Sequence, residues 1–188
     1  MRLNRKLKMV GQSSSWEVFF GRRYLCPMVN PRGLKTLQIR QARDSDIDDL
    51  VRLENECFDT YYREHKYGEP EFTECLHKKQ AIFFVAILNS PLVGYVAGSV
   101  RTSRCQSSAH LDSVAVLSGS RGKGIGDRLM QKFVEEAKQR ACKKVMLEVA
   151  TVNEGGIVFF SKVGFSKIRR LPGYYGEGLD GILMKLDI

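Results

Sequence analysis

A glycine-rich turn at residues 121–126 (RGKGIG) limits most strongly what this chain can fold into. Residues 110–117 before it read as a strand, and apolar side chains after it recur every four residues, which indicates a long helix. Glycines let the backbone bend closely, so successive N–H groups point into one concavity, and the helix N-terminus adds positive potential. Arg121 and Lys123 can add charge-assisted bonds. We therefore expect this turn to bind a pyrophosphate.

The spacing of the glycines separates the known nucleotide-binding patterns. A Walker A loop needs Ser or Thr after its Gly-Lys pair, but a glycine follows residues 122–123. The dinucleotide pattern needs a third glycine, where this chain has Asp127 or Leu129. The pattern that remains is R-x-x-G-x-G, met by Arg121, Gly124 and Gly126.

The rest of the chain predicts a mixed α/β (α+β) fold, with a central sheet of about seven strands and helices on both faces. Hairpin-like segments in the first half indicate antiparallel pairing, and strand–helix–strand alternation in the second half indicates parallel pairing. We expect Asp44 to cap the first helix. The predicted strands are residues 37–42, 81–88, 92–101, 110–117, 144–150, 165–170 and 182–187. Further helices are predicted at residues 72–79 and 125–141, and between Asn153 and Gly164.

The formal net charge of +9 divides unevenly along the chain. Residues 1–36 hold eight basic residues and one acidic residue, which is +7, whereas residues 37–188 hold 22 basic and 20 acidic residues, which is +2. The basic excess thus belongs to a tail, and the body carries no strong signal for nucleic acid. We expect a basic tail, disordered or targeting, at residues 1–36 and one folded domain at residues 37–188. A transit peptide is the alternative for the tail, and Met28 could also be the start.

Cysteine usage and hydropathy point to a compartment. The five cysteines are scattered without a C-x-x-C pair, and the three histidines do not cluster with them, so we expect reduced thiols and no metal site. The longest apolar run is far below the ~20 residues that a membrane span needs. We expect a cytoplasmic protein, monomer or homodimer, that binds neither membrane nor nucleic acid. Organelle import through the basic segment is the alternative.

Spaced matches around the turn carry a family resemblance from about residue 37 to the end of the chain. They are HLDSVAV at residues 110–116, LEV at 147–149, Asn153, GF at 164–165, YY at 174–175, Asp180 and Met184. Together with the R-x-x-G-x-G turn, they resemble the GNAT superfamily of acetyl-CoA-dependent acetyltransferases. Within it the chain is most similar to bacterial ribosomal-protein-alanine N-acetyltransferases and archaeal N-terminal acetyltransferases.

The resemblance implies roles for individual residues. Main-chain groups of Val114 and Val116 and the side chain of Asn153 would hold the pantetheine arm of acetyl-CoA, the cosubstrate. The Val116 N–H would also polarise the thioester carbonyl, and Glu148 would be the general base, acting through water. Amides of Arg121, Gly122, Lys123, Gly124, Ile125 and Gly126 would hold the pyrophosphate. The slot for the acceptor would be lined by Phe58, Tyr61, Tyr174 and Tyr175.

Two of these positions can also be interpreted from the pattern alone. Glu148 has apolar neighbours on its strand, and a carboxylate there is costly unless it is hydrogen-bonded, which suits a proton acceptor. The alternative is a strand-end carboxylate bonded to a neighbour. Asn153 also reads as a plain helix N-cap, and both of its roles are compatible.

Phe160 departs from the family pattern, which carries a tyrosine there as the acid that protonates the leaving thiolate. Phenylalanine has no proton to give, so Phe160 remains only as a cofactor contact. Tyr174 or Tyr175 could act as the acid instead. Water could suffice, because a thiol has a pKa near ~8.5. The remaining alternative is that catalysis is slow or lost.

We therefore expect an acetyltransferase that uses acetyl-CoA and acts on the N-terminal α-amine of a protein or peptide. An α-amine, with a pKa near ~8, needs only a modest base, whereas a lysine near ~10.4 needs more help. The alternative acceptor is a small amine, such as a polyamine, an amino acid or an antibiotic. An alternative of another class is a non-catalytic acyl-CoA-binding domain, which Phe160 supports and Glu148 opposes.

Overall fold

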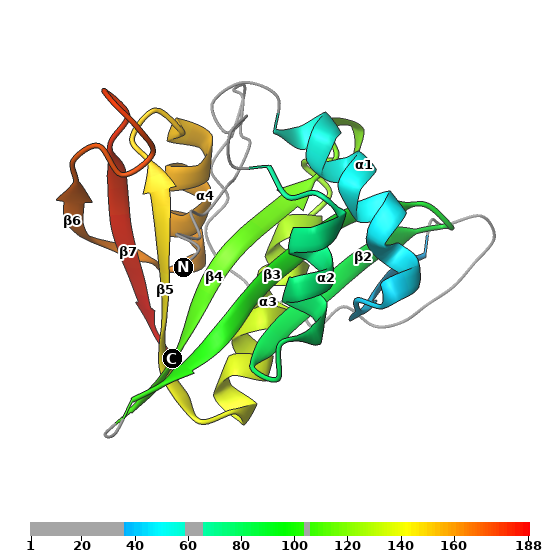
Figure 1. Ribbon diagram of the computed structural model, residues 1–188, viewed down its shortest axis with the longest axis horizontal. Helices are drawn as coiled ribbons and strands as arrows, with labels where there is room; N and C mark the ends of the chain where they lie inside the picture. The colour runs from blue at the N-terminus through cyan, green and yellow to red at the C-terminus, as the bar shows by residue number, and fades with distance from the viewer. Residues whose placement is uncertain (1–35, 59–65, 104–105) are drawn as a thin grey trace.

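The computed structural model describes residues 36–58, 66–103 and 106–188, and contains one seven-stranded mixed sheet (Figure 1). The strand order is β1-β2-β3-β4-β5-β7-β6. The strands are β1 (Leu37–Gln41), β2 (Ala81–Leu88), β3 (Leu92–Thr102), β4 (Ser107–Val116), β5 (Cys142–Ala150), β6 (Ser166–Leu171) and β7 (Gly181–Asp187). The predicted α/β fold is confirmed. The predicted basic tail lies, apart from Thr36, outside the described residues.

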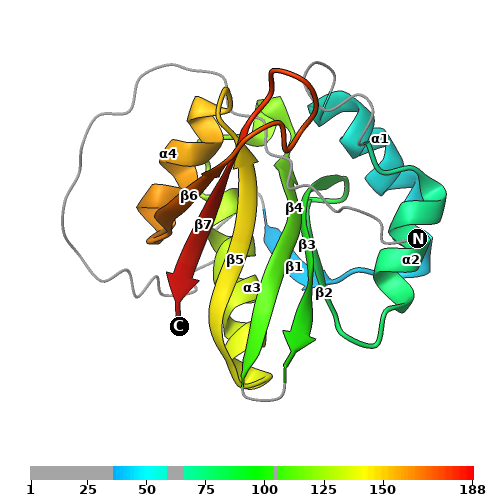
Figure 2. The same cartoon turned by 60° about the vertical axis from the view of Figure 1, so that its left-hand side comes forward.

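Helices cover both faces of the sheet, as predicted (Figure 2). The helices are α1 (Ile47–Cys57), α2 (Glu69–His77), α3 (Ile125–Gln139) and α4 (Glu154–Val163), with the 3-10 turns η1 (Asp44–Asp46) and η3 (Ser118–Ser120). One core packs Leu50 of α1 and Phe72 of α2 against β3. The other packs Leu129 and Phe133 of α3 against β2 to β5. The sheet is therefore the apolar middle layer of a three-layer domain.

The pairing of the last two strands differs from the prediction of parallel strands in the second half. Only β4 and β5 pair in parallel among the described strands. Strand β7 lies between β5 and β6 and is antiparallel to both. The side chains of β6 (sequence SKIRRL) are almost all exposed, whereas β7 buries Met184. The polar strand therefore takes the edge and the more apolar strand takes the inner position.

The start of α1 also differs from the prediction. Asp44 does not cap the helix, because η1 precedes it and Asp46 closes the turn. The buried Asp46 carboxylate accepts the Arg43 N–H at 2.8 Å and two bonds from the Arg40 guanidinium at 2.7 and 2.8 Å. Asp46 thus takes the N-cap position expected of Asp44, but its carboxylate bonds residues before the helix and not a helix N–H.

Helix α2 begins at Glu69, three residues before the predicted start. Gly68 is the N-cap, and its N–H donates to the side chain of Glu71 at 2.8 Å. Pro70 lies in the first turn, where its missing N–H costs nothing. The prediction followed the apolar spacing and missed these polar start signals.

Candidate active site

Strands β4 and β5 run together at one end and separate toward the other (Figure 1). Their pairing ends at His110 with Met146, although β4 continues to Val116 and β5 to Ala150. Both strands keep their outer neighbours, β3 and β7, along this stretch. The sheet is therefore split at its centre, and the inner edges of the two strands face the split.

The backbone of β4 turns its polar groups toward this split. The Leu117 N–H donates to the Val93 carbonyl at 2.9 Å, on the β3 side. Main-chain groups alternate in direction along a strand, so those of Val116 and Val114 point the other way. An extended arm could add to this edge as another strand would. This supports the predicted contacts of Val114 and Val116 with a pantetheine arm.

The glycine-rich turn lies at the N-terminus of α3, as predicted. Gly122 and Gly124 have φ angles of +73° and +71°, a region that side chains disfavour, and there is open space beside both. The first N–H that finds a partner inside α3 is that of Arg128, which bonds the Gly124 carbonyl at 3.1 Å. The N–H groups of residues 125–127 therefore have no main-chain acceptor within the helix, although the Asp127 N–H bonds its own carboxylate. A concavity of amides at a helix N-terminus fits an anionic pyrophosphate.

Gly126 has a different reason to be glycine. A Cβ atom there would lie 3.2 Å from the ring of Phe159 on α4. The glycine thus permits the close approach of α4 to the start of α3.

The basic side chains of the turn bond main-chain carbonyls nearby. Arg121 Nε donates to the Val116 carbonyl at 2.9 Å, and the Arg121 N–H donates to the Ser118 carbonyl at 3.2 Å. Lys123 Nζ donates to the Gly119 carbonyl at 2.6 Å. The contribution of Arg121 to the anion site stays a prediction, and the amides that fit an anion best begin at Gly122.

A chain of three ionisable side chains lies where β4 and β5 part. His110 Nδ1 is 2.7 Å from Asp112 Oδ1, and His110 Nε2 is 2.8 Å from Glu148 Oε2. Asp112 and His110 are 1% and 4% exposed, whereas Glu148 is 13% exposed. We call these three side chains the array. Glu148 is the member that solvent reaches most, so it is the member placed to take a proton from a substrate.

A β-bulge interrupts β4 at Asp112. Ala97 pairs with Ser113 and Gly98 with Leu111, so Asp112 is the extra residue that the bulge inserts opposite β3. Leu111 and Val114 both belong to the core under α3, although three positions apart on a regular strand would place them on opposite faces. Asp112 thus keeps the face of His110, two residues before it, and the bulge shifts Ser113 and the rest of β4 by one position.

The array determines the ionisation of its imidazole. Burial alone would lower the pKa of His110, but hydrogen bonds to Asp112 and Glu148 and their negative charges outweigh it and raise that pKa above 6.5. The two carboxylates thus hold one imidazole between them and favour its protonated form.

The two tyrosines of the β6–β7 connection have different roles. The Tyr175 hydroxyl donates to the Glu148 carbonyl at 2.8 Å, and Tyr175 is buried. Tyr174 is half-buried and hydrogen-bonds the Glu148 side chain. Burial, and then the charge of Glu148, raise the pKa of Tyr174 well above 10, so its phenol stays neutral. Tyr175 therefore supports the strand, and Tyr174 belongs to the site.

Three other predicted site residues can now be placed. Phe160 is fully buried, with its ring 5.4 and 5.6 Å from those of Phe159 and Phe165. Phe58 is also buried, just after the end of α1, where its ring packs in the core under that helix, and its predicted role in the acceptor slot stays a prediction. Tyr61 lies outside the described residues.

Asn153 is the N-cap of α4, as one interpretation predicted. Its Oδ1 accepts the Gly156 N–H at 2.9 Å. A Cβ atom on Gly156 would lie 2.8 Å from the Asn153 side chain, so the glycine gives the cap its room. The predicted pantetheine contact of Asn153 stays a prediction.

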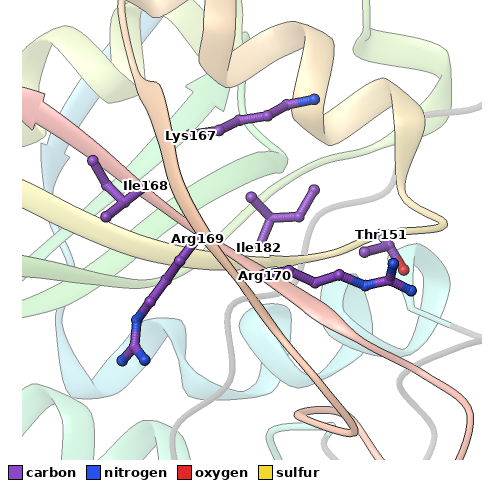
Figure 3. A pocket seen from close by; sticks show the side chains of 6 residues that line it. All are labelled: Thr151, Lys167, Ile168, Arg169, Arg170 and Ile182. Atoms are coloured by element: carbon purple, nitrogen blue, oxygen red, sulfur yellow. The ribbon is translucent and has the colours of Figure 1, made fainter.

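A hollow on the surface lies elsewhere, over β6 and β7 (Figure 3). Its lining residues are Thr151, Lys167, Ile168, Arg169, Arg170 and Ile182. The three cationic side chains point in different directions, and Arg170 bonds Asp180 at 2.5 Å. The basic groups of this hollow therefore do not converge on one ligand. Neither the array nor the glycine-rich turn lines the hollow.

Sequence reasoning missed His110 and Asp112 as functional residues. Both stood in the HLDSVAV segment, but only its main chain received a role. A signal existed, because residues i and i+2 of a strand share a face and two ionisable groups there are costly to bury alone. Nothing in the sequence indicated that Glu148 would meet them.

Several expected absences can be checked only within the described ranges. There, no three His, Cys, Asp or Glu side chains group as a metal site would require. No described helix is long and apolar enough to cross a membrane. Cys57, Cys75 and Cys142 are buried free thiols, and the other two cysteines lie outside the described residues.

Comparison with known proteins agrees with this geometry. Residues 47–165 match the model of the acetyltransferase (GNAT) family. The chain is 30% identical over 159 residues to the N-alpha-acetyltransferase of Sulfurisphaera tokodaii, covering 80% of this chain and 92% of that protein.

Two solved structures extend the comparison. The crystal structure of Ard1 from Thermoplasma volcanium superposes with a TM-score of 0.68 at 27% identity, covering 81% of this chain and 97% of that one. The ribosomal-protein-alanine N-acetyltransferase of Brucella melitensis superposes with a TM-score of 0.67 at 24% identity, covering 80% and 99%. At that identity the second likeness is one of fold alone.

Proposed function

The chain belongs to the acetyltransferase (GNAT) family, and we propose that it transfers an acetyl group from acetyl-CoA to the N-terminal α-amine of a protein or peptide. The relative that shares 30% identity over four-fifths of this chain is an N-alpha-acetyltransferase, which supports this acceptor class. The observation that carries the proposal is the position of Glu148, hydrogen-bonded to His110 where β4 and β5 part.

The described residues fit acetyl-CoA. The amides from Gly122 onward suit its pyrophosphate, and the split edge of β4 suits an extended arm running toward the array. Bound there, acetyl-CoA supplies an activated acetyl thioester. The Val116 N–H points into the split and can polarise a carbonyl held beside it. The protein thereby brings the acyl group and the acceptor together, which supplies much of the rate.

Glu148 acts as the general base. When the amine attacks, a C–N bond forms, the C–S bond breaks, and the nitrogen must lose one proton. Glu148 takes this proton, directly or through a water. His110 holds the Glu148 carboxylate in place through its Nε2.

The leaving thiolate needs a proton from another source than Phe160. Tyr175 donates its hydroxyl hydrogen to a main-chain carbonyl. Tyr174 is the described tyrosine left beside Glu148, and its neutral phenol has a proton to give. Solvent water is the alternative donor, since a thiol of pKa near ~8.5 needs little help.

The experiment is to follow free thiol release from acetyl-CoA with matched acceptors. The panel contains short peptides with free Ala, Ser or Met N-termini, the same peptides N-blocked but carrying lysine, and spermidine. We expect release with the free N-termini alone. Release only with lysine peptides or spermidine would reject the α-amine as acceptor. Tight acetyl-CoA binding without release from any acceptor would favour a binding domain instead.

A further inference from the structure

Asp112 is a buried carboxylate that the mechanism above does not need to touch. It is 1% exposed, and its Oδ1 lies 2.7 Å from His110 Nδ1. The other ring nitrogen is 2.8 Å from Glu148, so both edges of the imidazole are bonded and the ring has one orientation. Burying a second carboxylate beside Glu148 is costly, and Asp112 is the extra residue of a β-bulge.

We propose that Asp112 is a positioning residue of the acetyl transfer, which acts through His110 to hold the base Glu148 in place and ready to accept a proton. The inference rests on the proposed function. Asp112 orients the imidazole so that Nε2 faces Glu148. Its charge also keeps a proton on the ring, so that Nε2–H donates to Glu148 and fixes one of the carboxylate oxygens.

Among the residues that the structure describes, few charged and titratable groups surround the array. Asp112 and Glu148 act on His110 from β4 and β5. Tyr174, from the β6–β7 connection, hydrogen-bonds Glu148 and lies close enough to feel Asp112 and Arg101 of β3. Because Tyr174 stays neutral and Arg101 is exposed, Asp112 is the main second charge on the imidazole.

The adjacent residue offers a matched control. Ser113 is the other bulge residue and is fully buried, but it bonds the Tyr95 hydroxyl at 2.8 Å rather than the array. Ser113→Ala should therefore disturb the bulge without touching His110. Asp112→Asn removes one negative charge and keeps nearly the same shape.

The test compares the pH profile of kcat, at saturating acetyl-CoA and peptide, for the wild type and these two variants. For Asp112→Asn we expect kcat to fall roughly ten- to a hundredfold, with KM for acetyl-CoA unchanged, because the base is less well held and less basic. The acid limb of the profile should move to lower pH, since the array has lost a negative charge. The peptide amine is the same in all reactions, so a difference belongs to the protein. For Ser113→Ala the profile should coincide with that of the wild type.

A second measurement works without any acceptor. The imidazole of His110, assigned by its loss in His110→Asn, is titrated by NMR in the wild type, Asp112→Asn and Glu148→Gln. We expect a pKa above 6.5 in the wild type, still above it in Glu148→Gln, and a clear fall in Asp112→Asn. A pKa at or below 6.5 in Glu148→Gln would overturn the proposal, because Glu148 alone would then control the ring. If Asp112→Asn does not fold, the pKa of His110 in the wild type and in Glu148→Gln still tests the proposal.

The two proposals fail in different ways. No thiol release by the wild type from any acceptor would overturn the proposed function and, with it, the part of Asp112 in the transfer. Normal release by the wild type, with unchanged kcat and pH profile in Asp112→Asn, would overturn the role of Asp112 alone.

Discussion

Two buried polar clusters start from neighbouring residues of one bulge and end in different surroundings. The array runs from Asp112 through His110 to Glu148, at the split between β4 and β5. The second cluster, which we call the interior network, consists of Glu54, Tyr95 and Ser113. Tyr95 donates to the Glu54 carboxylate, and Ser113 bonds the Tyr95 hydroxyl at 2.8 Å. Both clusters contain a buried carboxylate held by hydrogen bonds.

The difference lies in access. All three members of the interior network are fully buried, and Glu54 Oε1 also accepts the Tyr67 N–H at 3.0 Å. Burial, and then the charge of Glu54, raise the pKa of Tyr95 well above 10, so the phenol remains a donor. The array ends instead in a carboxylate that solvent reaches. Similar groups thus join α1 to the sheet in one case, and in the other we propose that they exchange a proton with a substrate.

The largest expected effect is on the open end of the array. Glu148→Gln keeps the shape of the side chain and removes the base, so we expect kcat to fall about 10²–10⁴-fold. The dissociation constant for acetyl-CoA should change little, since the turn at residues 122–126 and the edge of β4 are untouched. Thiol release under single-turnover conditions, with acetyl-CoA binding measured by calorimetry, checks both.

The interior network provides the control for Glu148→Gln. Tyr95→Phe removes one hydroxyl from the interior network and leaves the array intact. Its kcat should stay within about twofold of the wild type, on the general expectation that distant sites act independently. Equal losses of kcat in Glu148→Gln and Tyr95→Phe would mean that the two clusters do not differ in function.

The second effect is on stability. Glu54→Ala leaves the Tyr95 hydroxyl and the Tyr67 N–H without their carboxylate partner and opens a cavity between α1 and β3. We expect the free energy of unfolding to fall by about 2–4 kcal/mol. Chemical denaturation followed by circular dichroism measures it, and kcat per folded molecule should hold near the wild-type value. A variant as stable as the wild type but inactive would contradict the separation of the two clusters.

The sequence predicted the parts of this site that depend on local rules. The turn at residues 121–126, the strand that carries Glu148 and the cap Asn153 are local, and their positions are confirmed. What it did not predict depends on register. The bulge at Asp112 arises from the pairing of β4 with β3, and His110 meets Glu148, 38 residues away, only where β4 pairs with β5. The insertion of β7 between β5 and β6 has the same origin, because edge and inner positions are decided by packing.

The smallest expected effect is the dependence of stability on pH. Since the pKa of His110 is higher in the folded protein than its ordinary 6.5, its imidazolium stabilises the fold fully below about pH 6.5, and this contribution is lost as the pH rises through the folded value. His110→Asn should lose that part of the slope. Urea unfolding of the wild type and the variant at several pH values between 5 and 9 measures the difference.

Tyr95→Phe, in the interior network, is the control for this pH dependence. Its phenol has a pKa raised well above 10, so Tyr95→Phe should lower the free energy of unfolding by a similar amount, about 1 kcal/mol, at every pH in that range. A parallel offset for Tyr95→Phe and a changed slope for His110→Asn would separate a cluster that only holds the fold together from one that exchanges protons. Parallel curves for both variants would instead mean that His110 keeps its ordinary pKa in the folded protein. His110 would then carry no extra proton in the folded protein with which to hold the Glu148 carboxylate.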